Sequence, residues 1–107
     1  MKKIDICGYE YEVNFIDKND ERIKGNDGLV LYNEFLILIR NDLNKIMTGC
    51  VLRHELTHAI MCVQGRWSHR KLTQEDMSEF IGFHAPFIVK TTDEIVKERF
   101  GKRGQTK

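Results

Sequence analysis

The chain has 107 residues, of which 41% are hydrophobic and 31% are charged, and its formal net charge is +1 at pH 7. These values fit one compact domain over residues 1–107 and leave little room for a second. The near balance of 17 basic and 16 acidic residues gives no reason to expect nucleic acid or an anionic membrane as the main partner.

The cysteines and the N-terminus predict the compartment. Cys7, Cys50 and Cys62 form no CxxC pair, and an odd number of cysteines predicts buried, reduced thiols rather than a disulfide framework or a zinc ribbon. The first residues lack the long apolar stretch of a signal peptide, and no run of about 18 apolar residues predicts a membrane-spanning helix. We therefore expect a cytoplasmic protein.

The first half of the chain has the patterns of β-strands. Two short runs that alternate apolar and polar side chains flank a turn at Gly8, and they predict a β-hairpin. A polar loop follows, and two further β-rich runs around Asn33 and Glu34 predict a second hairpin. The four runs are residues 3–7, 9–16, 29–32 and 35–40.

The second half of the chain has the patterns of α-helices. A first helix is expected to end at Gly65, because glycine is favoured just past a helix C-terminus. Its start stays open. Asn41 or Asp42 would cap a long version that contains Gly49, at about 1 kcal/mol relative to alanine, and Thr48 would cap a shorter one.

A second helix is expected to begin at Thr73, with Asp76 three residues later in a weak capping box. Pro86 should kink or interrupt this helix. A last helix is expected over residues 91–100, followed by a flexible tail over residues 101–107. Strands followed by helices predict an α+β fold in which an N-terminal antiparallel sheet precedes the helices.

The most informative stretch is His54-Glu55-Leu56-Thr57-His58. Residues four apart on a helix share a face, so the two imidazoles can converge on one metal ion, and zinc suits such ligands. Glu55 is then placed to take a proton from a metal-activated water. The competing interpretation is coincidence, and a random match in this composition has a probability on the order of one per cent.

The surroundings of the motif also matter. Met47, Cys50 and Val51 precede His54 at helical spacing, so we expect the motif to lie on the buried stripe of its helix. Cys50 itself is predicted to be a core residue rather than a ligand. It lies two turns from His58, roughly 12 Å along the axis, so the three side chains cannot close on one ion.

A catalytic zinc usually has three protein ligands and one water, so a third ligand must come from elsewhere. The next acidic cluster contains Glu75, Asp76 and Glu79. Glu75 and Glu79 share a helix face, so one could bind the metal while the other orients a histidine. Glu75 leads, and Asp76 and Glu79 stay open. The alternative is that acidic residues in a first turn are there for the helix dipole alone.

Together these elements resemble the gluzincin group of zinc peptidases, in which a glutamate on the second helix is followed by an acidic residue four positions later. Residues 52–59 and 75–80 resemble the small HExxH proteins encoded by phages and prophages. The similarity to ImmA/IrrE and SprT-like metallopeptidases is looser, and an ImmA/IrrE alignment would place the ligand at Asp76. The resemblance covers residues 45–90. It implies a minimal zincin-like fold, Zn²⁺ as cofactor and a protein or peptide substrate.

The resemblance also implies two further features. Zincins of this kind bind substrate as an extra strand along a sheet edge beside the active-site helix, and residues 35–40 are the best candidate edge, although a buried core strand is an equal alternative. Many use a Tyr, His or Arg to stabilise the oxyanion, for which Tyr32, His69 and His84 are available. The aromatic residues expected in the core are Trp67, Phe80, Phe83 and Phe87.

The leading hypothesis is therefore a zinc-dependent metallopeptidase in which His54, His58 and Glu75 hold the metal and Glu55 is the general base. The alternative is a non-catalytic zinc-binding protein on the same scaffold that acts by binding a partner. A weaker third possibility is a hydrolase of the deformylase kind, whose cysteine ligand would have to be Cys7, and Cys7 has none of the expected surroundings.

Overall fold

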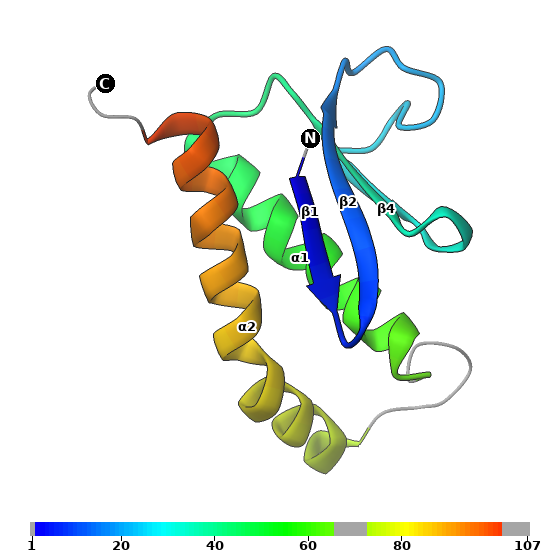
Figure 1. Cartoon of the computed structure of the whole chain (residues 1–107), viewed down its shortest axis with the longest axis vertical. Coiled ribbons are helices and arrows are strands. Elements are labelled where there is room, and N and C mark those ends of the chain that lie inside the picture. The colour runs from blue at the N-terminus through cyan, green and yellow to red at the C-terminus, as the bar shows by residue number, and fades with distance from the viewer. Residues whose placement is uncertain (1, 66–72, 102–107) are drawn as a thin grey trace.

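The computed structural model describes residues 2–65 and 73–101 (Figure 1). It confirms that a set of strands is followed by helices, which is the α+β class. No helix in this part of the chain is long and apolar enough to cross a membrane. The elements in chain order are β1 (Lys2–Ile6), β2 (Tyr9–Ile16), β3 (Gly28–Leu31), a 3-10 turn (Tyr32–Glu34), β4 (Leu36–Arg40), α1 (Lys45–Val63) and α2 (Gln74–Phe100).

The four strands form one mixed sheet in the order β1-β2-β4-β3. Both predicted hairpins are confirmed, because β1 pairs antiparallel with β2 and β3 pairs antiparallel with β4. The prediction of a wholly antiparallel sheet is wrong, because β2 and β4 run parallel at its centre. The loop after β2 and the strand β3 together return the chain to the side where β2 began, so β4 enters beside β2 in the same direction.

Strand β4 lies inside the sheet because it is apolar on both faces. Ile37 and Ile39 pack into the core beneath the helices, whereas Leu36 and Leu38 pack around Ile23 of the long loop on the other face. The expectation that residues 35–40 form the sheet edge is therefore wrong. The edge beside α1 is β3.

Helix α1 begins after Asn44, whose side chain accepts a hydrogen bond of 2.8 Å from the Met47 amide. The predictions that Asn41, Asp42 or Thr48 caps this helix are wrong. The Asp42 carboxylate is instead bound by the Arg40 guanidinium at 2.8 Å, and Thr48 is buried inside the helix. The helix ends at Val63, and the left-handed Gly65 follows it as predicted.

Helix α2 begins with the predicted capping box. The Asp76 amide donates to Thr73 Oγ1 at 3.0 Å, and the Thr73 amide donates to Asp76 Oδ2 at 3.1 Å. The helix then continues through Pro86 to Phe100, so the predicted interruption and separate last helix are wrong. Pro86 is exposed, and water can reach the Gly82 carbonyl that lacks its amide donor.

The aromatic residues of α2 are only partly in the core. Phe80 is buried and Phe87 is half-buried, but Phe83 is 80% exposed, so its prediction as a core residue is wrong. The first turns of α2 extend past the end of α1 (Figure 1), so α1 does not cover this part of the helix. Trp67 and most of the expected tail, residues 102–107, lie outside the described residues.

The three cysteines are free, as expected, but none is buried. Cys7 and Cys50 are exposed and Cys62 is intermediate, so the prediction of buried thiols is wrong. Cys7 follows β1 in the tight turn before β2, where its φ is 51° and its side chain is exposed. The exposure of Cys50 bears on the site itself, because it lies on the same helix as the HExxH motif.

Candidate functional site

The two histidines of the motif lie one turn apart near the middle of α1. His54 Nε2 and His58 Nε2 are 3.1 Å apart, and their rings are nearly perpendicular, with an interplanar angle of 74°. Two nitrogen ligands of a tetrahedral zinc ion are about 3.4 Å apart. The two ring nitrogens therefore converge at close to the separation that one metal ion requires, which is the first test of whether these residues fit zinc.

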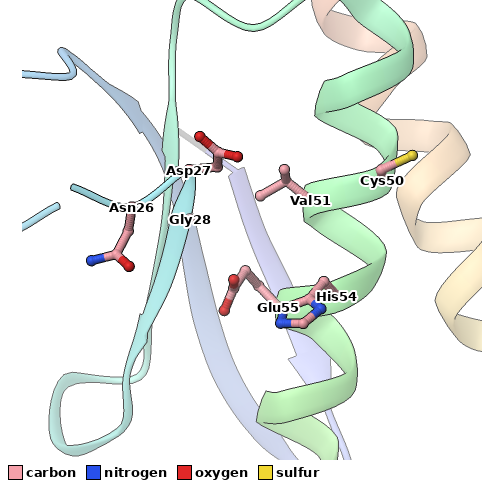
Figure 2. A pocket seen from close by; sticks show the side chains of 7 residues that line it. All are labelled: Asn26, Asp27, Gly28, Cys50, Val51, His54 and Glu55. Atoms are coloured by element: carbon pink, nitrogen blue, oxygen red, sulfur yellow. The ribbon is translucent and has the colours of Figure 1, made fainter. Parts of the chain in front are cut away.

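The motif is divided between two faces of α1. His54 and His58 are exposed, as are Met47 and Cys50, so the expectation that the whole motif lies on the buried stripe is wrong. The sulfur of Cys50 points away from β3 in Figure 2. The stripe that does face the core consists of Thr48, Val51, Leu52, Glu55, Leu56, Ala59 and Ile60.

Glu55 therefore has a different environment from the histidines beside it. Its side chain is 8% exposed and extends from α1 toward β3 (Figure 2). Within residues 2–65 and 73–101, no hydrogen bond or ion pair reaches its carboxylate. Burial raises the pKa of the Glu55 carboxyl above its ordinary value, against the opposing effect of His54 and His58. A desolvated carboxylate without a partner is well suited to accept a proton.

Glu55 and His54 line a pocket of about 370 Å³ between α1 and the start of β3 (Figure 2). Gly28 forms the β3 side of this pocket. A Cβ atom added at Gly28 would lie 3.0 Å from Glu55 Cγ and 2.6 Å from Val51 Cγ1, so strand and helix approach each other as closely as a glycine permits. The remaining lining residues are Asn26, Asp27 and Cys50.

Among the described residues, the outer edge of β3 has backbone groups without a partner beside this pocket. The Arg40 amide donates to the Asp27 carbonyl at 3.0 Å, and Asp27 and Arg40 are opposite each other in the β3–β4 register. Hydrogen-bonded pairs alternate along an antiparallel ladder, so Gly28 and Val30 direct their amide and carbonyl groups away from β4. These groups face the open edge of the sheet.

The acidic cluster of α2 is not brought to the histidines. In the described part of the chain, no group of three His, Cys, Asp or Glu side chains has an arrangement that could hold a metal ion. Glu75 and Glu79 are exposed, and Asp76 caps its own helix. His84 Nε2 lies 3.1 Å from Gln64 Oε1 at the end of α1, so the turns before His84 extend beyond that end. Glu75 as third ligand stays a prediction.

The two described candidates for oxyanion stabilisation, Tyr32 and His84, lie beside different parts of the fold. Tyr32 is half-buried, and its pKa is raised first by burial and then by its proximity to Cys62 and Glu55, which places it on the Glu55 side of the fold. His84 instead lines a different pocket, together with Gln64 and Glu79. His69 lies outside the described residues.

Three residues of the pocket were not expected from the sequence: Asn26, Asp27 and Gly28. A signal for Gly28 was present, because a glycine directly before a short apolar run can mark a close backbone approach. Asn26 and Asp27 have no such signal, since polar residues before a strand are ordinary loop residues. Comparison of the chain with family models, curated proteins and solved structures found no match.

Proposed function

We propose that the chain is a zinc-dependent metallopeptidase whose site is centred on His54, Glu55 and His58. The observation that carries this proposal is the position of Glu55. Its side chain is 8% exposed and lines the pocket together with His54, and within the described residues its carboxylate takes part in no hydrogen bond or ion pair. A partly desolvated carboxylate with a raised pKa that lines a pocket beside a histidine is typical of a functional site.

Each group has a defined role in this proposal. His54 and His58 would hold the zinc through their Nε2 atoms, which are 3.1 Å apart. When bound, zinc would act as a Lewis acid that activates water and polarises a carbonyl. Glu55 would accept the proton of the attacking water and donate it to the leaving amine, as its raised pKa favours.

The open edge of β3 supports a peptide as the substrate. Gly28 and Val30 offer amide and carbonyl groups, and an extended peptide could pair with them as a fifth strand. Such a strand would run past Glu55, because a Cβ atom at Gly28 would lie only 3.0 Å from Glu55 Cγ. Main-chain pairing of this kind recognises an extended peptide with little regard for its sequence, so specificity would come from the side-chain pockets.

The third ligand is proposed to be Glu75, with Asp76 and Glu79 as alternatives. Two imidazoles leave zinc short of the three protein ligands usual in catalytic sites. Glu75 is exposed and, among the described residues, has no hydrogen bond or ion pair to give up, whereas Asp76 would lose its bonds in the capping box. Binding of zinc by Glu75 would require the first turns of α2 to approach His58.

Zinc loading and cleavage can be tested together. The purified chain is loaded with one equivalent of zinc and incubated with a mixed peptide library, with and without a chelator, and new termini are identified by mass spectrometry. We expect cleavage that the chelator abolishes and that returns when zinc is restored. Stoichiometric zinc without any cleavage would contradict the peptidase.

A specific observation favours a second candidate, a non-catalytic zinc-binding protein that acts by binding a partner. The first half of α2 exposes Met77, Ile81 and the largely exposed Phe83, and no third zinc donor joins the histidines within the described residues. A zinc complex closed by four protein ligands would favour this candidate, because an open position is needed for catalysis.

The three free cysteines suit a reducing compartment, so we propose a cytoplasmic location for either candidate.

A further inference from the structure

We propose that Gly28 is a positioning residue, which fixes the Glu55 carboxylate beside the open edge of β3. The catalytic consequence of this inference rests on the proposed peptidase function. A Cβ atom at position 28 would lie 3.0 Å from Glu55 Cγ and 3.3 Å from Glu55 Oε2. Any side chain there would have to displace Val51 and the Glu55 side chain or move the strand.

The requirement at this position is space alone and not backbone conformation. The glycines with positive φ in the described residues are Gly8, Gly25 and Gly65, and Gly28 is not among them. Its backbone is that of an ordinary strand residue, which alanine adopts without strain. The effect of Gly28→Ala therefore comes from the added methyl group alone. Many other glycine substitutions also strain the backbone, which would obscure such a contact.

Two neighbours on α1 share the space that Gly28 leaves. The nearest is Val51, whose Cγ1 atom would lie 2.6 Å from the added Cβ, and the other is Glu55. Val51 belongs to the hydrophobic core, so its contact with β3 supports the fold. The contact with Glu55 instead sets where a proton acceptor lies. The two consequences can be separated, because they depend on different side chains.

The first experiment compares Gly28→Ala with the double variant Gly28→Ala/Val51→Ala. Val51→Ala removes the atom that meets the new methyl group at 2.6 Å, and the methyl group fills part of the space. We expect the double variant to regain most of the melting temperature lost in Gly28→Ala. Its kcat should stay several-fold below wild type, because the carboxylate still has to give way to the new methyl group by a few tenths of an ångström, and zinc affinity and KM should change little.

Gly82→Ala is the matched control. Gly82 lies on α2, and a Cβ atom there would meet nothing within 4 Å, so both the melting temperature and kcat should match or exceed wild type. If Gly28→Ala/Val51→Ala is folded and as active as wild type, the inference is overturned.

A stability cycle tests the placement without any activity assay. Gly28→Ala is introduced into the wild type and into Glu55→Ala, which lacks the Cγ atom. We expect a smaller loss of unfolding free energy in the Glu55→Ala background, because only the contact with Val51 remains. Equal losses in both backgrounds would overturn the inference. A wild-type chain that binds zinc but cleaves no peptide would instead contradict the proposed function, and the cycle would still decide whether Gly28 sets the position of Glu55.

Discussion

The Nε2 atoms of His54 and His58 lie 3.1 Å apart on the exposed side of α1, while Glu55 between them is buried against the strand β3. The two faces of α1 therefore serve different purposes, metal binding on the exposed face and proton transfer on the buried face. Exposed imidazoles can reach a metal ion from solvent, and the desolvated carboxylate keeps a raised pKa. Five consecutive residues of one helix suffice for this arrangement only because β3 covers the Glu55 side.

Zinc affinity should depend on both histidines. His54→Ala and His58→Ala should each weaken zinc binding by more than about 100-fold, which exceeds the usual effect of losing an outer-sphere partner. His84→Ala is the matched control, because His84 contacts Gln64 instead and should leave zinc binding unchanged. Competition titration with a chromophoric chelator gives the affinities. Unchanged affinity in His54→Ala or His58→Ala would exclude the paired site.

Two acidic residues of α2 should have different roles, with Glu75 as a zinc ligand and Asp76 as the cap of the helix. Glu75→Gln should lower zinc affinity and leave the metal-free melting temperature unchanged. Asp76→Ala should leave zinc affinity unchanged and lower the metal-free melting temperature. It removes the capping bond to Thr73, a loss of about 1 kcal/mol in unfolding free energy. Titration and thermal unfolding of both variants check this. Wild-type affinity in Glu75→Gln would exclude Glu75 as the third ligand and direct attention to Glu79.

The stability of the metal-free chain should depend on pH through Glu55. Burial raises the pKa of this carboxyl in the folded state, so the folded chain holds its proton to higher pH than the unfolded chain does. Stability is then complete below the unfolded pKa and falls as pH rises toward the folded value. Metal-free Glu55→Gln should melt above wild type at about pH 7, and this difference should shrink toward about pH 4. A difference that does not vary with pH would contradict the assigned burial.

Gly49 offers a gain in stability away from the pocket. It lies inside α1, where an alanine is favoured over glycine by up to about 1 kcal/mol. A Cβ atom there would meet Arg53 Nη1 at 3.4 Å and Val96 Cγ2 at 3.9 Å, both ordinary contacts. Gly49→Ala should therefore unfold at higher urea concentration with an unchanged slope. A destabilised variant would mean that α1 and α2 are packed more tightly at Gly49.

Local features of the fold could be predicted from the sequence. The turn at Gly8, the capping box of Thr73 and Asp76, and the glycine after α1 each depend on residues that are close in the chain. The helical spacing of His54 and His58 is local too, and their ring nitrogens do converge. The start of α1 was missed because Arg40 binds the Asp42 carboxylate, a competition that no helix pattern reveals.

Features that depend on distant residues could not be predicted. The parallel pairing of β2 with β4 is set by the path of the intervening loop. Because of this pairing, β3 and not the predicted β4 forms the edge of the sheet. The exposure of Phe83 follows from α2 being longer than the surface that covers it. The pocket residues Asn26 and Asp27 come close to α1 only through tertiary packing, so no motif marks them, and Gly28 alone had a local signal.

The most direct test of the central claim is the rate of peptide hydrolysis by zinc-loaded wild type and Glu55→Gln, measured at equal zinc occupancy. Glutamine keeps the size of the side chain and cannot accept the proton, so the account predicts a fall in kcat of at least about 100-fold, the lower range for general acid–base catalysis, with zinc still bound. Hydrolysis by Glu55→Gln at the wild-type rate would contradict the account.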